Sequence, residues 1–169
     1  MSPVPRTSRP PRRPARLLAI ATATFALLAG ALVAGSPAAA AGTLLSQGKP
    51  VVASSIEGAG TPASAAVDGN TGTRWASQFS DPQWIYVDLG ASASITQVVL
   101  NWEAAYATGY QIQTSNDAVT WTSIYTTTTG TGGIQTLNVS GSGRFVRLTG
   151  TQRTTQYGYS LWEFGIYGS

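Results

Sequence analysis

The chain of 169 residues contains no cysteine and no histidine, and the two absences exclude many kinds of chemistry. Without a thiolate or an imidazole there is no cysteine nucleophile, no Ser-His-Asp triad and no zinc site of the usual nitrogen and sulfur type. A secreted domain without disulfides must rely on its core, to which a bound ion can add stability. Carboxylate chemistry and oxygen-ligated cations remain open.

Charged residues are also scarce, at 10% of the chain, and the basic ones are unevenly distributed. The first part of the chain has no acid and five arginines: Arg6, Arg9, Arg12, Arg13 and Arg16. An uncharged run at 17–33 and a stretch of small residues at 36–41 follow. A basic segment, an apolar segment and small residues at the exit predict a secretory signal peptide over 1–41, rather than a membrane anchor, and a secreted protein.

The remaining residues, 42–169, have a different charge balance from the whole chain. The formal net charge of the chain is +3, but five basic and seven acidic residues remain after the leader, which leaves −2. The basic footprint of a nucleic-acid-binding protein is therefore absent, and we expect no nucleic-acid partner. The length suits one domain with one core, which we expect to be monomeric and, after cleavage, free of the membrane.

The sequence after the leader has the pattern of many short strands. Apolar Ile85, Val87 and Leu89 alternate with Trp84 and Tyr86, and turn-forming residues separate the runs. One helical turn is expected at 63–67, and a turn at 141–143. The pattern predicts an all-β fold, a jelly-roll sandwich of about eight strands. We expect these strands near 49–54, 84–89, 95–102, 109–115, 121–126, 133–139, 144–149 and 161–167.

One loop concentrates oxygen atoms that a cation could use. Asp68 is followed by Gly69, Asn70 and, five positions after the acid, Thr73. Calcium takes six to eight oxygen ligands, many of them backbone carbonyls, and the glycine lets the chain turn tightly. The spacing does not fit an EF-hand. On spacing alone, a turn capped by Asp68 explains the loop better than an ion site does.

Five motifs then follow one another in the order typical of one family. They are Ala66-Val67-Asp68-Gly69-Asn70, Thr73-Arg74-Trp75, 83–90, 143–148 and 163–167. Together they resemble the discoidin domain, also called the coagulation factor 5/8 type C domain, and within it the family 32 carbohydrate-binding modules. The resemblance spans 42–169. It implies a galactose-binding-like sandwich that binds carbohydrate and is not an enzyme.

The resemblance also implies a structural calcium, which would tie the first long loop to the last strand. In the family such an ion is held by the loop and by a glutamate near the end of the domain. The corresponding ligands in this chain are the Ala65 carbonyl, the Asp68 carboxylate, the Asn70 carbonyl, Thr73, the Trp162 carbonyl and the Glu163 carboxylate. With the resemblance added, calcium is favoured over the plain turn.

A second set of residues has the chemistry that sugars require. Aromatic rings pack on sugar C–H faces, and arginine and carboxylate groups bind hydroxyls. The segments 80–84, 102–106 and 156–164 resemble discoidin modules of bacterial chitosanases and β-glucanases. That resemblance implies a sugar site for β-linked glucosamine or glucose polymers, and a secreted glycoside hydrolase as a possible partner. Its residues would be Glu57, Arg74, Phe79, Glu103 and Tyr157.

Other interpretations of these residues are open. Arg74 and one glutamate could form an ordinary surface pair. Glu57 and Glu103 could act as the two carboxylates of a small glycoside hydrolase, although so small a sandwich offers little cleft. A protein- or lipid-binding adhesion domain is a third class, but its hydrophobic loop spikes are not evident. Arg147 is expected in a structural ion pair, with Asp88 as one candidate partner.

Overall fold

The computed structural model describes residues 42–169, so the predicted leader, 1–41, lies outside the described residues. The described part contains no helix that is long and apolar enough to cross a membrane. Its elements are β1 (Thr43–Leu44), β2 (Val51–Ala53), the 3-10 helix η1 (Ala63–Ala66), β3 (Trp75–Ala76), β4 (Gln83–Trp102), β5 (Ala107–Ser115), β6 (Thr122–Thr127), β7 (Ile134–Arg153) and β8 (Ser160–Gly168).

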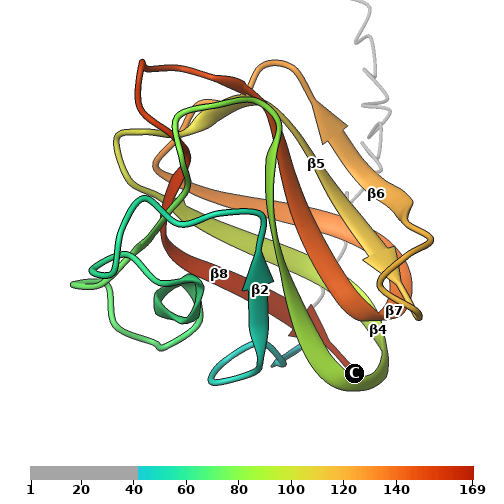
Figure 1. Cartoon of the computed structure of the whole chain (residues 1–169). Coiled ribbons are helices and arrows are strands. Elements are labelled where there is room, and N and C mark those ends of the chain that lie inside the picture. The colour runs from blue at the N-terminus through green and yellow to red at the C-terminus, as the bar shows by residue number, and fades with distance from the viewer. Residues whose placement is uncertain (1–41) are drawn as a thin grey trace, which may run out of the picture. The chain divides into compact units, whose positions relative to one another are not determined.

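The strands form a sandwich of two antiparallel layers that share the long strands β4 and β7 (Figure 1). In the front layer β2 pairs with the first half of β4, which pairs with the second half of β7, followed by β5 and β6. In the back layer the second half of β4 lies between the first half of β7 and β8. The predicted all-β sandwich is therefore confirmed.

The core lies between the layers and follows from the alternation in the sequence. Ile85 and Val87 have no exposed surface, and Leu89 is 7% exposed. Trp84 and Tyr86, between them, lie half-buried on the opposite side of β4. Because neighbouring strand residues point to opposite faces, the alternating half of β4 can bury one row of side chains. The predicted alternation is correct.

The prediction missed the short strands β1 and β3, and it divided two long strands into halves. The predicted strands 84–89 and 95–102 are halves of β4, which passes through Gly90 at a φ of 89°. The predicted strands 133–139 and 144–149 are likewise halves of β7, and the expected turn at 141–143 is part of that strand. The strands bend there from one layer into the other, and glycine at these positions admits the bend.

The expected pair of Arg147 and Asp88 is not formed. Asp88 instead accepts two hydrogen bonds from Arg144, at 2.8 Å from Nε and 2.7 Å from Nη2. The register places Arg147 opposite Tyr86, whereas Asp88 lies opposite Phe145, next to Arg144 in the chain. The pairing depends on a register between strands more than fifty residues apart, which the local pattern does not contain.

Candidate functional site

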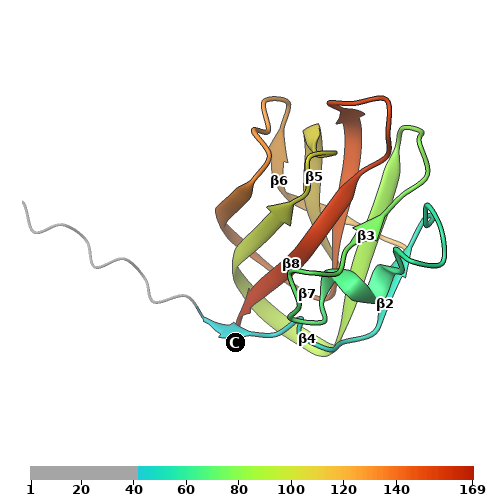
Figure 2. The ribbon, with the colours of Figure 1, turned by 90° about the vertical axis from the view of Figure 1, so that its left-hand side faces the viewer.

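Loops between strands gather at one end of the sandwich (Figure 2). Glu57 lies in the loop after β2, where its backbone N–H donates to the Ala76 carbonyl oxygen at 2.7 Å. Arg74 immediately precedes β3. Its Nη2 lies 3.6 Å from Glu57 Oε2, with the two side chains 32% and 38% exposed. The pairing of the first loop with β3 therefore places a carboxylate beside a guanidinium.

Ser160, the first residue of β8, joins two further parts of this end. Its hydroxyl accepts a hydrogen bond from Arg74 Nη1 at 2.8 Å. Its carbonyl oxygen accepts the backbone N–H of Glu103, the residue after β4, at 3.0 Å. Glu103 Oε2 in turn accepts the N–H of Ala105 at 2.9 Å. These bonds fix Arg74 and Glu103 relative to each other although they come from distant parts of the chain.

Tyr157 and Phe79 supply the aromatic surface of this end. Tyr157 lies in the loop between β7 and β8, and Phe79 lies in the loop between β3 and β4. The two rings meet edge to face, with centroids 5.6 Å apart and an interplanar angle of 82°. The side chains are 53% and 50% exposed. Edge-to-face contact holds two exposed rings in a fixed arrangement that a ligand can use.

A partly buried network supports the Tyr157 loop. Arg153 Nη1 donates to the carbonyl oxygen of Tyr157 at 3.2 Å, and Arg153 Nε lies 3.2 Å from Asp81 Oδ2. The hydroxyl of Tyr159 donates a short hydrogen bond to Asp81 Oδ1. Burial, and then the Asp81 carboxylate, raise the pKa of the Tyr159 hydroxyl well above its ordinary value. Tyr159 therefore stays protonated and keeps the donor that this network needs.

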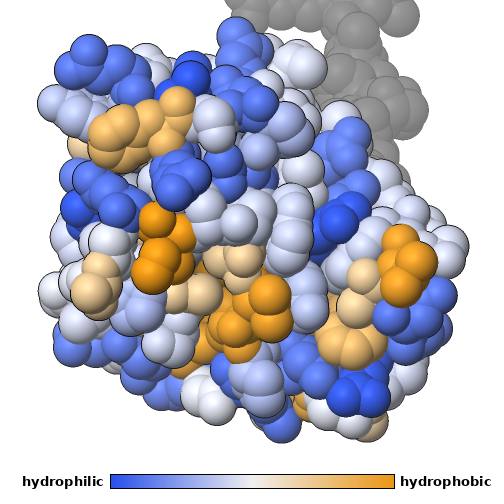
Figure 3. Space-filling view, viewed as in Figure 1, coloured by the Kyte–Doolittle hydropathy of each residue, from blue (hydrophilic) through white to orange (hydrophobic). Residues whose placement is uncertain are grey.

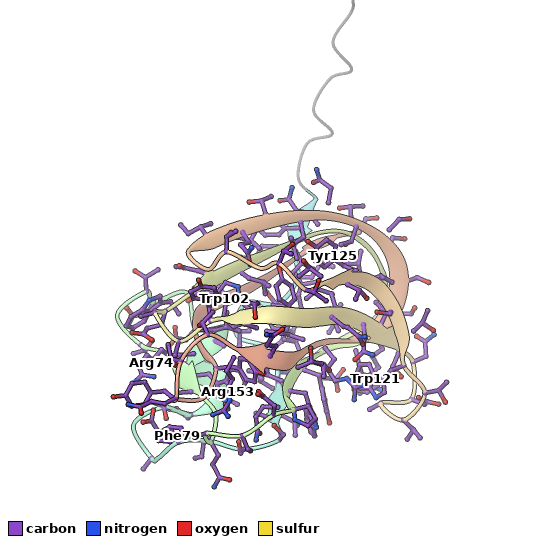
Figure 4. The ribbon with its side chains drawn as sticks, turned by 90° about the horizontal axis from the view of Figure 1, so that it is seen from above. Arg74, Phe79, Trp102, Trp121, Tyr125 and Arg153 are labelled. Carbon is purple, nitrogen blue, oxygen red and sulfur yellow. The ribbon has the colours of Figure 1, made fainter. Side chains whose placement is uncertain are left out.

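The polar and aromatic side chains surround one hollow of about 230 Å³, which we call the loop-end site. Four of the five predicted sugar-binding residues line it: Glu57, Arg74, Glu103 and Tyr157. Phe79 lies at the edge, where it lines an adjoining hollow with Glu57 and Gln78. Viewed from above, Arg74, Phe79 and Arg153 lie on the same side of the domain (Figure 4). The structure brings the five residues together.

Sequence reasoning did not name five residues that line the same hollow: Ala76, Ala105, Gly158, Tyr159 and Ser160. A Cβ on Gly158 would collide with the backbone oxygen of Ser77 and lie 2.7 Å from that of Gln78, so only glycine fits this close approach. Tyr159 and Ser160 are 1% exposed. A glycine between two tyrosines was a visible signal, but the bonds of Ser160 depend on long-range pairing.

The loop-end site is suited to binding polar ligands that carry some positive charge. It presents two carboxylates against one guanidinium, together with an exposed aromatic ring. It is poorly suited to glycoside hydrolysis, which needs a general acid that burial keeps protonated. Glu57 is 38% exposed beside Arg74, and Glu103 accepts a backbone N–H. Neither glutamate is fully buried, as such an acid would be.

The predicted ion loop follows η1 and is closed by its own side chains. Asp68 Oδ1 accepts the Asn70 N–H at 2.8 Å, and Asp68 Oδ2 accepts the Thr73 hydroxyl at 2.7 Å. The same hydroxyl contacts the Asn70 carbonyl oxygen at 2.9 Å. Gly69 has a φ of +76°, which few other residues adopt. The loop is a capped turn whose oxygen atoms already converge, so the turn and the ion site are compatible interpretations.

Glu163, on β8, faces this loop from the other side. Its Oε1 is buried and has no hydrogen-bond partner among the described residues. Burial, and then the charge of Asp68, raise the pKa of the Glu163 carboxyl. The helix η1, which carries Ala65, packs against β8, which carries Trp162 and Glu163. A buried oxygen without a partner, close to a second carboxylate, fits a cation. A cation would bind the unpartnered oxygen and would also reduce the repulsion between the two carboxylates.

The family of the chain is shown by comparison with known proteins. The family model described as the F5/8 type C domain matches residues 50–164. A curated relative, the polysaccharide lyase 8 family protein HylA of Enterococcus faecalis, is 40% identical over 68 residues, which cover 40% of this chain. The match spans 5% of the length of that relative. It is therefore a likeness to a small part of a much larger protein.

Two solved binding modules are similar to this chain over nearly their whole length. Chitosan-binding module 1 of a chitosanase/glucanase from Paenibacillus sp. IK-5 is 55% identical, covers 75% of this chain and 99% of its own, and has a TM-score of 0.72. Module 2 of that enzyme, solved with chitotriose, is 52% identical, covers 73% and 99% of the two chains, and has the same TM-score of 0.72.

These neighbours are binding modules and not catalytic domains, which agrees with the expectation that the described domain is not an enzyme. The family resemblance found in the sequence is confirmed by the match over most of the domain. The chain belongs to the F5/8 type C domain family, and its described residues form a carbohydrate-binding module.

Proposed function

We propose that the loop-end site binds β-linked glucosamine or glucose oligosaccharides, with chitosan-like chains preferred. The observation that carries the proposal is the composition of one hollow, in which Glu57 and Glu103 outnumber Arg74 beside the exposed ring of Tyr157. An ammonium group of glucosamine can pair with a carboxylate, and the ring can pack on the sugar C–H face. The solved neighbour with chitotriose supports this ligand class.

Each residue has a distinct task in this proposal. Glu103 binds the ammonium group through Oε1, because Oε2 already accepts the Ala105 N–H and this bond fixes the carboxylate. Arg74 and Glu57 orient the hydroxyls, and Tyr157 and Phe79 provide the stacking surface. The loops are held by hydrogen bonds before a ligand arrives, which limits the entropy lost on binding. One small site binds weakly, so repeated units of a polymer would raise the apparent affinity.

The proposal includes a structural calcium held by the Asp68 and Glu163 carboxylates, Thr73, and the carbonyls of Ala65, Asn70 and Trp162. The unpartnered Oε1 of Glu163 supports this set. No three acidic side chains gather anywhere in residues 42–169, so the backbone would supply much of the coordination. The ion would hold the loop that leads directly into Arg74, which is stabilisation and not catalysis.

The proposal also includes secretion through the leader and cooperation with a secreted glycoside hydrolase. A binding module holds its polymer without altering it, so an enzyme acting on the same polymer would benefit from the shared location. The basic and apolar pattern of residues 1–41 supports secretion.

Calorimetric titration with a glucosamine trimer and its N-acetylated counterpart tests the proposed ligand. We expect Glu103→Gln to weaken binding of the glucosamine trimer by roughly 10- to 100-fold, the usual value of a hydrogen bond to a charged group. Glutamine keeps an oxygen for the Ala105 N–H, so the loop geometry is preserved. The N-acetylated trimer, which has no ammonium groups, should bind weakly to both proteins.

The matched control is Asp88→Asn. It also removes one negative charge, but from the ion pair with Arg144 on the front layer, away from the loop-end site. It should leave binding of the glucosamine trimer unchanged. If Glu103→Gln and Tyr157→Ala both bind as the unaltered domain does, the loop-end site is not the sugar site. Release of reducing ends from the trimer would contradict the non-catalytic role.

A further inference from the structure

The outer face of the front layer carries an unusual row of side chains across its strands. The register aligns one residue from each of β2, β4, β7 and β5, in the order Val52, Tyr86, Arg147 and Gln113. This face is open in the ribbon view and is not covered by another element of residues 42–169 (Figure 1). In the same view, the surface mixes hydrophobic and near-neutral residues with hydrophilic ones (Figure 3).

Four aromatic side chains form one cluster on this face. Tyr86 stacks on Trp84, with centroids 5.6 Å apart at 13°. It also contacts the rings of Trp121 and Phe145, each at 5.7 Å. All four are half-buried, and they lie outside the core between the layers. The solvent face of an antiparallel sheet is normally polar, so such a cluster on it indicates a surface that meets a partner.

Arg147 is held at the edge of this cluster with its terminal nitrogens free. Its guanidinium lies over the Trp121 ring, 4.0 Å from the centroid. Its Nε donates to Gln113 Oε1 at 2.9 Å, and that oxygen also accepts the Thr149 hydroxyl at 3.0 Å. Among the described residues, Nη1 and Nη2 have no hydrogen-bond acceptor and no carboxylate. Arg144, by contrast, is paired with Asp88.

The charges of the domain are divided between this face and the rest. Lys49, Arg144 and Arg147 lie here with Asp88, whose pKa is lowered by Arg144 first and also by Lys49. The face therefore carries three positive charges against two negative ones, those of Asp88 and of Asp117 in the turn before Trp121. The remaining described residues carry two positive and five negative charges. A ligand complementary to this face is anionic, the opposite of the ligand that suits the loop-end site.

We propose that Arg147 and the four rings form a second binding site, the sheet-face site, for a polysaccharide that bears carboxylates, such as a uronic-acid polymer. The two free nitrogens of Arg147 match a carboxylate in bidentate geometry, and stacking on Trp121 holds the guanidinium in place before binding. The neighbouring rings offer apolar surface to sugar C–H groups. Trp121 lies across the domain from Arg74 and Phe79 (Figure 4), so both sites can be occupied together.

Nuclear magnetic resonance titration of the unaltered domain with a galacturonic acid trimer tests the proposal. We expect the indole N–H of Trp121 and the Nε–H of Arg147 to shift, while the signals of Arg74 and Tyr157 stay in place. The methyl-esterified trimer has the same rings without the charges and should cause little change. Glu103→Gln should leave the uronate titration unaltered, because its side chain belongs to the other site.

A pair of arginine variants separates a specific contact from general charge attraction. Arg147→Gln should weaken binding of the galacturonic acid trimer by roughly 10-fold or more, as expected for a lost charge-assisted contact. Arg144→Gln removes the same charge from the same face, and we expect a loss of less than about 3-fold, because that arginine is already paired. Both variants should bind the glucosamine trimer normally.

Several results would overturn the proposal. An equal loss in both arginine variants would mean bulk attraction only, and unchanged spectra would mean that the rings merely pack on one another. Shifts confined to the loop-end site would place the uronate there. A doubled mass in light scattering, with the same signals broadened, would show that a second copy occupies the face. The titration of the unaltered domain decides the matter even if Arg147→Gln fails to fold.

Discussion

The loop-end site and the sheet-face site use the same kinds of side chain but are supported in different ways. At the loop end, Arg74 is fixed by a hydrogen bond to Ser160, 86 positions away, and Tyr157 by a loop that one arginine holds. On the sheet face, Tyr86 and Arg147 are opposite one another in a continuous ladder. A loop site therefore depends on a few single contacts, whereas a sheet site shares the stability of the core.

The strongest way to separate the two regions is Gly158→Ala. The added methyl group would meet the backbone oxygens of Ser77 and Gln78, so the loop carrying Tyr157 must move. Overpacking of this kind costs about 1–3 kcal/mol of stability, and the movement should weaken glucosamine binding by about 10-fold or more. Thermal melts and calorimetric titration measure the two effects.

The control for this substitution is Gly60→Ala, where a methyl group meets no atom within 4 Å. It should have little effect on melting or binding. Uronate binding at the sheet face should survive Gly158→Ala wherever the domain is folded. If both ligands are lost in parallel below the melting temperature, the two regions are not independent.

Adding and removing calcium tests the same difference between the loop-end site and the sheet-face site. The expected effect is smaller than that of Gly158→Ala, and it is reversible. The ion loop ends one residue before Arg74, so filling it should stabilise the domain and improve glucosamine binding a few-fold. At ten times the dissociation constant, the gain in unfolding free energy should be about 1.4 kcal/mol. Differential scanning calorimetry with calcium and with chelator measures it.

Asp68→Asn should remove the response to calcium, and Asp88→Asn should retain it. Sheet-face binding should not respond to the ion in any of these proteins. An identical melting temperature with and without calcium would leave the loop as a capped turn alone, held by Asp68 and Thr73.

The smallest effect is expected from Asp117→Ala, in the turn that leads to Trp121. The backbone N–H groups of Thr120 and Val119, and then the Ser115 hydroxyl, lower the pKa of Asp117 well below the ordinary value of 3.8. A lowered pKa in the folded state adds stability above the ordinary pKa, and this stability is lost as the pH falls through the folded value. The variant should melt slightly lower at neutral pH, and the difference should shrink under acid conditions.

Melting curves at a series of pH values check this expectation, with Asp117→Asn as the matched variant. Asparagine keeps an oxygen acceptor for the turn but does not titrate between pH 2 and 7, so it should restore part of the stability without the pH dependence. Glucosamine binding should be unaffected by either change. A difference that grows on acidification would contradict the assignment of the cause.

The sequence predicted the layers of the fold better than the path of the chain between them. Alternation identified Ile85 and Val87 as core residues because burial on one face leaves a period of two. The continuity of β4 through Gly90 was missed, because a glycine that permits a bend resembles a glycine that ends a strand. The pairing of Asp88 with Arg144 was missed because strand register is set by pairing with distant residues.

In the candidate sites too, the sequence did not predict contacts between residues far apart in the chain. Family motifs named Glu57, Arg74 and Glu103, and the structure gathers them around one hollow, although their sugar-binding role is still a prediction. The support from Ser160 was not visible, since its partners lie 57 and 86 positions away. The aromatic cluster on the front layer was not predicted, because the sequence does not show that Trp84 and Trp121 meet around Tyr86.

The pairing of β1 with β8 determines where a linker to another domain would attach and how the loop-end site would then be oriented. Thr43 lies opposite Gly168, so the first and last described residues leave the sandwich together, at the end away from the loops (Figure 2). β8 starts at Ser160, beneath the hollow, and eight steps of a strand span roughly 26 Å. A linker at either terminus would therefore attach at the end of the domain opposite the loop-end site, and that site would remain free to face the polymer.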